Sequence, residues 1–188
     1  MTLVRIDPDR YDVDVALAYA TAGNFTGRPV YRGDAGCYLH ADAAALLAAA
    51  VDLARPQGLR LKILDAFRPA EAQWVLWSHT PDPDFLADPR RGSPHSMGAA
   101  VDLTLVADQG RELDMGTEFD AFTPLSHHGN RDIPPAAQRN RHLLLGIMTA
   151  AGWDFYRNEW WHYQMFSARA HYPVLSDTVL GADGMMPR

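Results

Sequence analysis

The chain has 188 residues, of which 47% are hydrophobic and 21% are charged, and its formal net charge is −6. A chain of this length and composition can fold as one domain that buries roughly 70% of its unfolded surface, which argues against disorder. The acidic balance, with a pI of about 5.7, argues against a general surface for nucleic acid or anionic membranes. We therefore expect neither of these partners.

Cysteine usage and the N-terminal residues bear on the compartment. Cys37 is the one cysteine in the sequence, so no intrachain disulfide can form and no oxidising compartment is required. Its neighbours carry no activating motif, which favours a structural role. The first residues form no apolar signal region, and no stretch approaches the ~18 apolar residues of a membrane span. We therefore expect a cytoplasmic protein.

The first half of the chain alternates strand-like and helical patterns. Residues 11–19 alternate between polar and apolar and predict a half-buried strand, and residues 24–27 predict a loop. Asp42 is expected to cap an Ala/Leu-rich helix that continues to about Arg55, before Pro56 and Gly58 stop it. Residues 59–64 alternate at period two and predict a second strand.

A second helix is expected to begin at Pro69 and to continue to about Ser78. Its tryptophans, Trp74 and Trp77, are expected to pack in the core. The proline-rich residues 80–94 then predict a long loop, and loops of that length in compact domains usually line a site.

The second half contains two further strand-like stretches around a helix. Residues 99–106 predict a strand followed by a turn at 108–110, and residues 123–135 predict a loop. A helix is expected over 136–151, ended by Gly152, and the aromatic-rich residues 153–166 are strand-like. This order lacks regular βαβ alternation, so we expect a single α+β domain over residues 1–188, with helices against a largely antiparallel sheet.

Four residues together suggest a metallohydrolase. His95 and Asp102 stand seven positions apart, and Glu159 and His162 stand three apart. Two imidazoles and one carboxylate are a sufficient ligand set for a catalytic zinc that keeps one coordination position open. The remaining Glu159 is the residue type that takes a proton from water.

The spacing raises one geometric difficulty. On a regular strand, Glu159 and His162 would point to opposite faces, so the strand must end, bulge or twist there if both serve one site. His95 and Asp102 similarly need a turn between them, and Gly98 is free to adopt the positive φ angle that such a turn requires.

Other histidines compete as ligands. His127 and His128 are the best rivals, because they lie in a polar loop and loops often carry sites. Adjacent residues seldom ligate one ion, so at most one of the two would serve. The other candidates outside the motif are His40, His79, His142 and His171.

The motif Ser93-x-His95-x-x-Gly98-x-Ala100-x-Asp102, followed by Glu159-Trp-Trp-His162, resembles that of the D-alanyl-D-alanine dipeptidases of the VanX type. These are zinc peptidases related to D,D-carboxypeptidases and to the Hedgehog signalling fold. The resemblance covers nearly the whole chain. Its further landmarks are residues 19–31, 65–69, 115–120 and 126–128.

The resemblance implies a fold, a reaction and a role for each site residue. His95, Asp102 and His162 would bind one zinc per chain, with Glu159 as general base and acid. Arg68 would stabilise the transition state, and Ser93 and Asp120 would hold the carboxylate and amino ends of a D-alanyl-D-alanine substrate. Loops 80–94 and 121–135 would close the pocket around two alanines, so longer peptides and L,L-dialanine should react poorly.

Two alternative functions remain at this stage. One is a D,D-carboxypeptidase or murein endopeptidase of the same superfamily, which would need to reach the cell wall. The other is a non-catalytic zinc-stabilised binding domain, against which the presence of Glu159 argues. The sequence leaves open glycopeptide resistance versus D-alanine salvage, the physiological metal, the role of the tail after Tyr172 and whether the chain forms a homo-oligomer.

Overall fold

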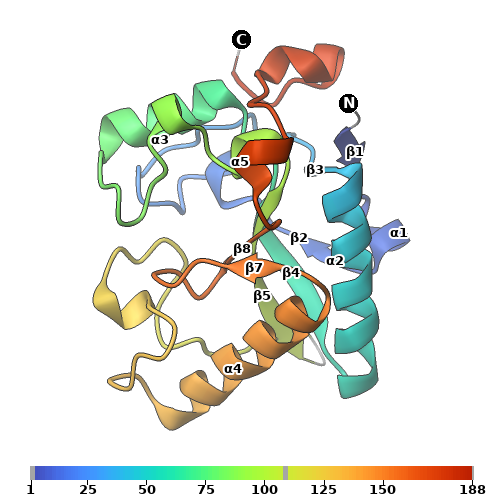
Figure 1. Cartoon of the computed structure of the whole chain (residues 1–188), viewed down its shortest axis with the longest axis vertical. Helices are drawn as coiled ribbons and strands as arrows, with labels where there is room; N and C mark the ends of the chain where they lie inside the picture. The colour runs from blue at the N-terminus through green and yellow to red at the C-terminus, as the bar shows by residue number, and fades with distance from the viewer. Residues whose placement is uncertain (1–2, 108–109, 188) are drawn as a thin grey trace.

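The structure is a computed structural model that describes residues 3–107 and 110–187 (Figure 1). Its strands are β1 (Leu3–Arg5), β2 (Asp14–Val15), β3 (Tyr38–His40), β4 (Arg60–Asp65), β5 (Ala100–Ala107), β6 (Arg111–Glu112), β7 (Asp154–Phe155) and β8 (His162–Gln164). Its α-helices are α1 (Pro8–Tyr11), α2 (Ala41–Ala54), α3 (Ala70–His79), α4 (Pro135–Ala150) and α5 (Ala168–His171). Short 3₁₀ turns are η1 (Ala18–Ala20), η2 (Arg55–Gln57), η3 (Pro89–Arg91), η4 (His95–Met97), η6 (Pro124–Ser126) and η7 (Asp177–Asp183).

The main sheet has the strand order β2-β4-β5-β8-β7, and β6 pairs with β5 off this path. All its pairings are antiparallel except β2 with β4, while β1 and β3 form a separate antiparallel pair. The expected α+β architecture with a largely antiparallel sheet is therefore confirmed.

Helices α2 and α4 pack together and against the central strands β4 and β5 (Figure 1). Leu47 of α2 and Leu144 of α4 are fully buried in the same core as Leu103 of β5. Because side chains alternate along a strand, Asp102 and Thr104 point to the face opposite Leu103. The helices thus stabilise one face of the sheet, and the other face is free to carry polar groups.

The expected strand over residues 11–19 is largely wrong. Asp7 caps α1 through the backbone N–H of Arg10, and Pro8 takes its first position. Asp12 then adopts a left-handed conformation that ends the helix at Tyr11. Only β2 is extended here, because it pairs with β4 over two residues before η1 begins.

The starts of α2 and α3 differ from expectation by one or two residues. The N-cap of α2 is His40, whose Nδ1 accepts a hydrogen bond from the Asp42 backbone N–H at 3.2 Å, so Asp42 lies inside the first turn. Pro69 is the N-cap of α3 and not its first helical residue. Its extended ψ of 149° turns the chain into the helix.

The expected core position of the two tryptophans of α3 is wrong for one of them. Trp74 is 47% exposed, whereas Trp77 is partly buried against the core. The fully buried face of α3 is formed by Ala72, Gln73 and Leu76. Because this face of α3 is turned toward the interior, Trp74 lies on the outer side of the helix.

The remaining elements follow the expected order. Helix α4 and strand β5 begin and end within one residue of expectation. Of the turn expected at 108–110, residues 108–109 lie outside the described residues. The stretch 153–166 is two short strands, β7 and β8, separated by a turn. Within the described residues, no helix is long and apolar enough to cross a bilayer.

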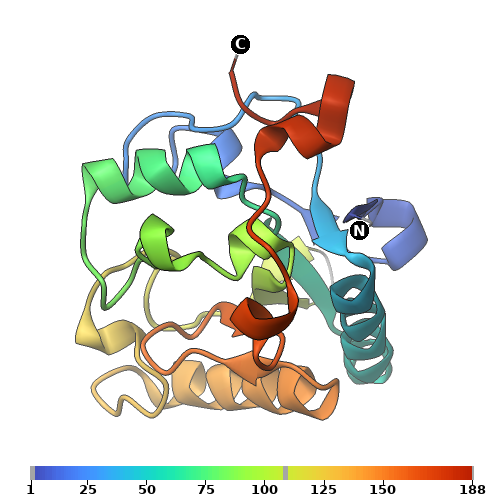
Figure 2. The same cartoon turned by 45° about the horizontal axis from the view of Figure 1, so that its top comes forward.

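The tail after Tyr172 runs from α5 across the start of α3 (Figure 2). Leu175 donates its N–H to the Ser96 carbonyl at 2.8 Å and accepts from the Ala70 N–H at 3.0 Å. Farther along, Met185 is fully buried, and its carbonyl accepts from the Arg32 N–H at 2.7 Å. The tail therefore ties together η4 and the start of α3, the two segments that flank the polar face of the sheet.

Candidate metal centre and its pocket

Three carboxylate or imidazole groups lie in a row across the central strands. Asp65 of β4 is paired in register with Asp102 of β5, and Asp102 is paired with His162 of β8. Directly opposed residues of antiparallel strands project from the same face with their Cβ atoms only ~5 Å apart. The register alone thus brings Asp102 and His162 together, although they are 60 positions apart in sequence.

His95 reaches the same point from outside the sheet. It lies in η4, which ends at Gly98 in a left-handed conformation with φ of 67°. A Cβ on Gly98 would stand 2.6 Å from Leu3 Cδ2 and 2.9 Å from the His40 backbone nitrogen. The turn between His95 and Asp102 therefore requires glycine both for its φ angle and for its close packing.

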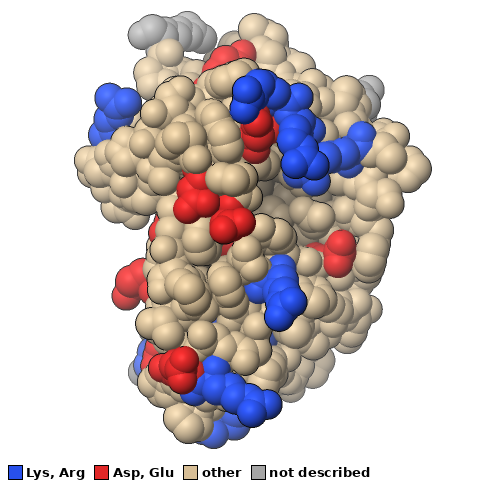
Figure 3. All heavy atoms as spheres, turned by 60° about the vertical axis from the view of Figure 1, so that its left-hand side comes forward, with Lys and Arg blue, Asp and Glu red and all other residues tan. Residues whose placement is uncertain are grey.

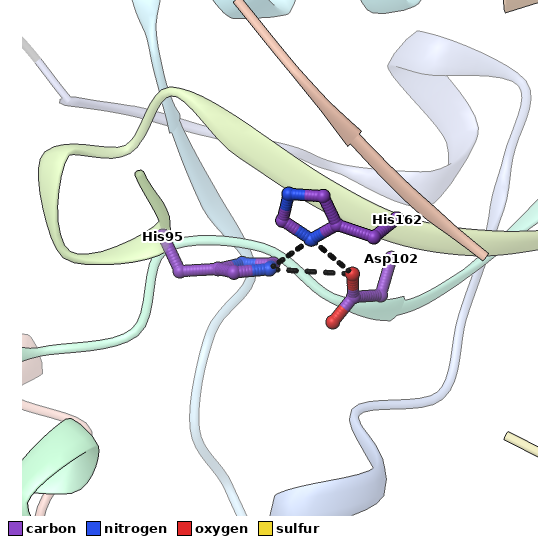
Figure 4. Close-up of side chains that lie close together, drawn as sticks. All are labelled: His95, Asp102 and His162. Carbon is purple, nitrogen blue, oxygen red and sulfur yellow. Dashed lines mark hydrogen bonds and ion pairs between the residues drawn. The ribbon is translucent and has the colours of Figure 1, made fainter. Parts of the chain in front are cut away.

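His95, Asp102 and His162 converge on one point (Figure 4). The His95 Nε2 to His162 Nδ1 distance is 3.1 Å, and the Asp102 Oδ1 atom lies 3.2 Å from His95 Nε2 and 3.0 Å from His162 Nδ1. Zinc–nitrogen bonds of about 2.0–2.1 Å in a tetrahedron separate neighbouring ligands by roughly 3.3 Å. All three separations are close to that value.

Hydrogen bonds on the outer side of each ring fix the histidine tautomers. His95 Nδ1 donates to the Ala66 carbonyl at 2.7 Å, and His162 Nε2 donates to the Gln164 side-chain oxygen at 3.1 Å. With protons on those outer nitrogens, the two inner nitrogens present lone pairs to each other and to the Asp102 carboxylate. Three electron-pair donors that face one point need a cation there, and two imidazoles with a carboxylate suit zinc.

Glu159 reaches the same site because it is not on a strand. It lies in the turn between β7 and β8, where its N–H donates to the Tyr156 carbonyl at 3.3 Å and its carbonyl accepts from the His162 N–H at 3.4 Å. Its Oε2 is 3.9 Å from His162 Nδ1. The turn thus removes the difficulty that the spacing of the two residues posed for a continuous strand.

The landmark at residues 126–128 holds this turn. The Ser126 carbonyl accepts from the Trp160 N–H at 3.1 Å, and the His128 N–H donates to the Arg157 carbonyl at 2.9 Å. These two bonds bracket Glu159. The segment therefore contributes to the site through its backbone.

The electrostatic environments of Glu159 and Asp102 differ. Burial, together with the nearby charges of Asp102 and Asp120, raises the pKa of Glu159 well above its ordinary value. Burial also acts to raise the pKa of Asp102, but when the inner nitrogens of His95 and His162 carry protons in place of a metal ion, their charge and hydrogen bonds outweigh burial and hold that pKa well below its usual range. Asp102 is thus a permanent carboxylate, whereas Glu159 is suited to exchanging a proton.

Arg68 is buried and belongs to the site. Its Nε donates to Asp65 Oδ2 at 2.8 Å, and one terminal nitrogen lies 3.5 Å from Asp102 Oδ2. Its guanidinium also stands 5.0 Å from the centre of the Tyr19 ring. The surface salt bridge that such an arginine usually forms is therefore not its role here.

Ser93 and Asp120 line the same pocket. Ser93 is buried, and its hydroxyl accepts from the His95 N–H at 3.3 Å. Asp120 Oδ1 accepts from the Tyr19 hydroxyl at 3.1 Å, while its buried Oδ2 finds no hydrogen-bond partner among the described residues. Asp120 also has a φ of 59°, a left-handed conformation that is uncommon for residues other than glycine.

The pocket has a volume of about 180 Å³ and is small for a ligand site, since drug-sized ligands usually occupy ~300–1,000 Å³. Every residue assigned to the site from sequence lines it: Ser93, His95, Asp102, Asp120, Glu159, His162 and Arg68. Pro83, Phe85 and Leu86 of the expected 80–94 loop form part of its wall. From the 121–135 loop, Phe122 supports this wall by stacking on Phe85 with ring centres 5.0 Å apart.

Several residues that line the pocket or hold its side chains in place escaped assignment from sequence. Tyr19 and Asp65 lie inside sequence landmarks, but only the structure shows that they contact Asp120 and Arg68. Gln73 orients Arg68 through a 2.9 Å hydrogen bond from inside a helix whose pattern signals only packing. Tyr156 and Arg169 also line the pocket, and no local pattern marks either of them.

The rival histidines do not join the cluster. His128 is packed beside the rings of Phe155 and Tyr163, with its Nε2 buried and without a partner among the described residues. In residues 3–107 and 110–187, His95, Asp102 and His162 form the one group of three with metal-ligand geometry.

Comparison with known proteins agrees with this geometry. The family model described as D-ala-D-ala dipeptidase (Peptidase_M15) matches residues 2–179. The D-alanyl-D-alanine dipeptidase of Escherichia coli K12 is 46% identical over 166 residues, which cover 88% of this chain and 85% of the relative. The proteins of the same name from Streptomyces coelicolor and Enterococcus faecium are 38% and 36% identical, over 78% and 77% of this chain and 83% and 82% of their own lengths. The chain therefore belongs to the D-ala-D-ala dipeptidase family of peptidases.

Proposed function

We propose that residues 1–188 form one domain that hydrolyses D-alanyl-D-alanine to two D-alanines, with one zinc held by His95, Asp102 and His162. The observation that carries the proposal is the convergence of three electron-pair donors on one point beside Glu159. Family membership and the names of the relatives support the substrate. Zinc supplies Lewis acidity in such a site: it polarises a carbonyl oxygen and makes a water molecule more acidic.

Glu159 performs the proton transfers. As a carboxylate it takes a proton from the water that attacks the peptide carbonyl carbon, and it then delivers that proton to the leaving amine as the C–N bond breaks. The raised pKa of Glu159 makes it a stronger base than an ordinary glutamate, and its burial keeps competing water away.

Arg68 stabilises the oxygen that gains negative charge when water adds. Its charge is permanent, and Asp65 and Gln73 hold it in one orientation before substrate arrives. A fixed cation in a buried site needs no reorganisation during the reaction, which is the main source of this kind of stabilisation.

The charges of the site fit a substrate with a free ammonium group. Asp65, Asp102, Asp120 and Glu159 lie around the Arg68 guanidinium, so this part of the site has an excess of acidic groups. When all four carboxyl groups are ionised, a divalent metal and one ammonium group would balance their excess negative charge. The unpartnered Oδ2 of Asp120 is the group that we assign to the substrate ammonium.

This assignment favours a dipeptidase over a D,D-carboxypeptidase. A carboxypeptidase accepts a long chain on the amino side of the scissile bond, where this pocket instead presents a buried carboxylate. A substrate without a terminal ammonium would leave that carboxylate uncompensated, which costs several kcal/mol.

A substrate panel tests the proposal. The purified zinc-loaded protein should hydrolyse D-alanyl-D-alanine, and its kcat/KM should be lower by ~100-fold or more for N-acetyl-D-alanyl-D-alanine, tri-D-alanine and L-alanyl-L-alanine. Comparable values for the D,D- and L,L-dipeptides would refute the pocket assignment. Preference for the N-acetylated substrate would favour the carboxypeptidase alternative. The cytoplasmic location and the oligomeric state stay predictions, which cell fractionation and sedimentation would test.

A further inference from the structure

Arg169 lies at the pocket, next to the segment that carries Ser93. It belongs to the short helix α5 and lines the pocket. Its Nε donates to the Gly92 carbonyl at 2.9 Å, and Gly92 directly precedes Ser93. The guanidinium is therefore tied to the segment that carries Ser93 and His95.

Gly92 makes this attachment possible. Its φ is 76°, and a Cβ there would stand 2.9 Å from Val174 Cγ2 and 3.0 Å from Met97 Cε. Glycine thus allows the chain after α5 to pack directly on the loop before η4. This close packing holds Arg169 at the edge of the pocket.

The charge of Arg169 is not neutralised by the protein. Among the described residues, no carboxylate lies within ion-pairing distance of it, whereas Arg90 on the adjacent turn pairs with Asp88 at 2.6 Å. Burial, and then the charge of Arg91, lower the pKa of Arg169, so its environment lacks a compensating anion. Figure 3 shows one face of the molecule, where basic side chains gather beside a hollow with acidic side chains next to them.

Two incompletely partnered charges of opposite sign thus line one small pocket. Asp120 contributes a buried oxygen without a hydrogen-bond partner, and Arg169 contributes a guanidinium without an acidic partner. A free dipeptide carries an ammonium at one end and a carboxylate at the other, and its two residues span about 7 Å. A zwitterionic dipeptide therefore offers a charge of opposite sign to each of these two groups.

We propose that Arg169 binds the C-terminal carboxylate of the dipeptide substrate next to Ser93, and so selects for a free carboxylate at that end. This assignment rests on the proposed function and adds a specificity-determining residue to it. A guanidinium can form paired hydrogen bonds with both carboxylate oxygens, which a lysine ammonium cannot reproduce.

The test compares two substrates and three variants. The zinc-loaded wild type, Arg169→Gln, Arg169→Lys and the control Arg90→Gln are assayed with D-alanyl-D-alanine and with its C-terminal carboxamide. Arg90 is a matched control, because it is a nearby arginine whose charge Asp88 already neutralises. Thermal unfolding checks that each variant is folded.

Arg169→Gln should raise KM for the free dipeptide by roughly 10-fold to 100-fold, which is the range for a hydrogen bond to a charged group. Its kcat should change less than about threefold, and its kcat/KM for the carboxamide should stay close to that of the wild type. Arg169→Lys should recover part of the affinity for the free dipeptide, and Arg90→Gln should behave as the wild type.

Two results would overturn the assignment of Arg169. An unchanged KM for the free dipeptide in Arg169→Gln would exclude contact with the carboxylate. An equal loss of kcat/KM for the free dipeptide and for the carboxamide would assign Arg169 a purely structural role. If the wild type itself fails to hydrolyse D-alanyl-D-alanine, the proposed function fails, and this assignment fails with it.

Discussion

The two ends of the pocket differ in how fully their polar groups are partnered. At the metal end, each histidine has a fixed outer hydrogen bond, and Asp102 contacts both rings and Arg68. At the other end, Asp120 satisfies one oxygen through Tyr19 and leaves the second buried and unpartnered. The protein itself thus holds the side chains at the metal end in place, whereas Asp120 keeps one oxygen without a partner among the described residues.

This comparison separates residues that should govern kcat from residues that should govern KM. Groups at the metal end contact the scissile bond in the proposed reaction, so their loss should lower kcat. Asp120 contacts the substrate terminus, so its loss should raise KM.

Glu159→Gln should lower kcat by about 10³-fold or more, because the amide cannot accept a proton from water. The variant should retain about one zinc per chain, since Glu159 is not among the three proposed ligands. Steady-state kinetics combined with metal analysis checks both statements. Near-normal turnover would remove Glu159 from the role of base.

Arg68→Met should lower kcat by roughly 10²-fold to 10³-fold, the range for removal of a fixed transition-state donor. The kcat of Arg68→Lys should lie between those of Arg68→Met and the wild type. Lysine keeps the positive charge, but it cannot bond to both Asp65 and Gln73 as the guanidinium does. Equal activity of the Met and Lys variants would show that the charge of Arg68 is not used in the reaction.

Asp120→Asn should raise KM for D-alanyl-D-alanine by about 10-fold to 100-fold with little change in kcat. The same change should stabilise the metal-free protein, because burial and the neighbouring Asp102 raise the pKa of Asp120 and make its ionised form costly at neutral pH. Urea unfolding of the metal-free protein measures this. A fall in kcat without a change in KM would place Asp120 at the metal end.

His128 provides a control for the ligand set. Burial, and then Arg141, lower its pKa from 6.5 to about 4. The folded state therefore binds fewer protons than the unfolded state between these values, and His128 makes the protein less stable as pH falls through this window.

Through this effect, His128 lowers the free energy of unfolding by about 2 kcal/mol between pH 7 and pH 5. His128→Gln should remove that part of the pH dependence of urea unfolding and leave the zinc stoichiometry unchanged. Loss of zinc in this variant would instead support His128 as a metal ligand.

The convergence of His95, Asp102 and His162 could be predicted from sequence because their identities and spacing belong to a long motif. The position of Glu159 could not, because the aromatic stretch 153–166 lacks a local signal for the turn that divides it. The turn is fixed by backbone bonds to residues 126–128, and such long-range contacts leave no periodic pattern. Arg169 escaped for the same reason, since it acquires its place only through the packing of α5 against Gly92.

The predicted elements are correct where the hydrophobic periodicity is strong, and they are wrong where capping residues determine the start and end of a helix. Strand β4 and helix α4 follow their patterns closely. The alternation over 11–19 misleads, because Asp7 and Pro8 start a helix and Asp12 ends it within the same stretch. Trp74 is exposed because the helix face that packs on the core is made of smaller residues, which the tryptophan spacing does not reveal.

The most direct test of the central claim is a zinc titration of the chelator-treated, metal-free protein, followed by its rate of D-alanyl-D-alanine hydrolysis. We expect no turnover without metal, a linear rise of the rate with added zinc and saturation at one equivalent of zinc per chain. Full activity of the metal-free protein, or zinc binding at one equivalent with no hydrolysis of the dipeptide, would contradict it.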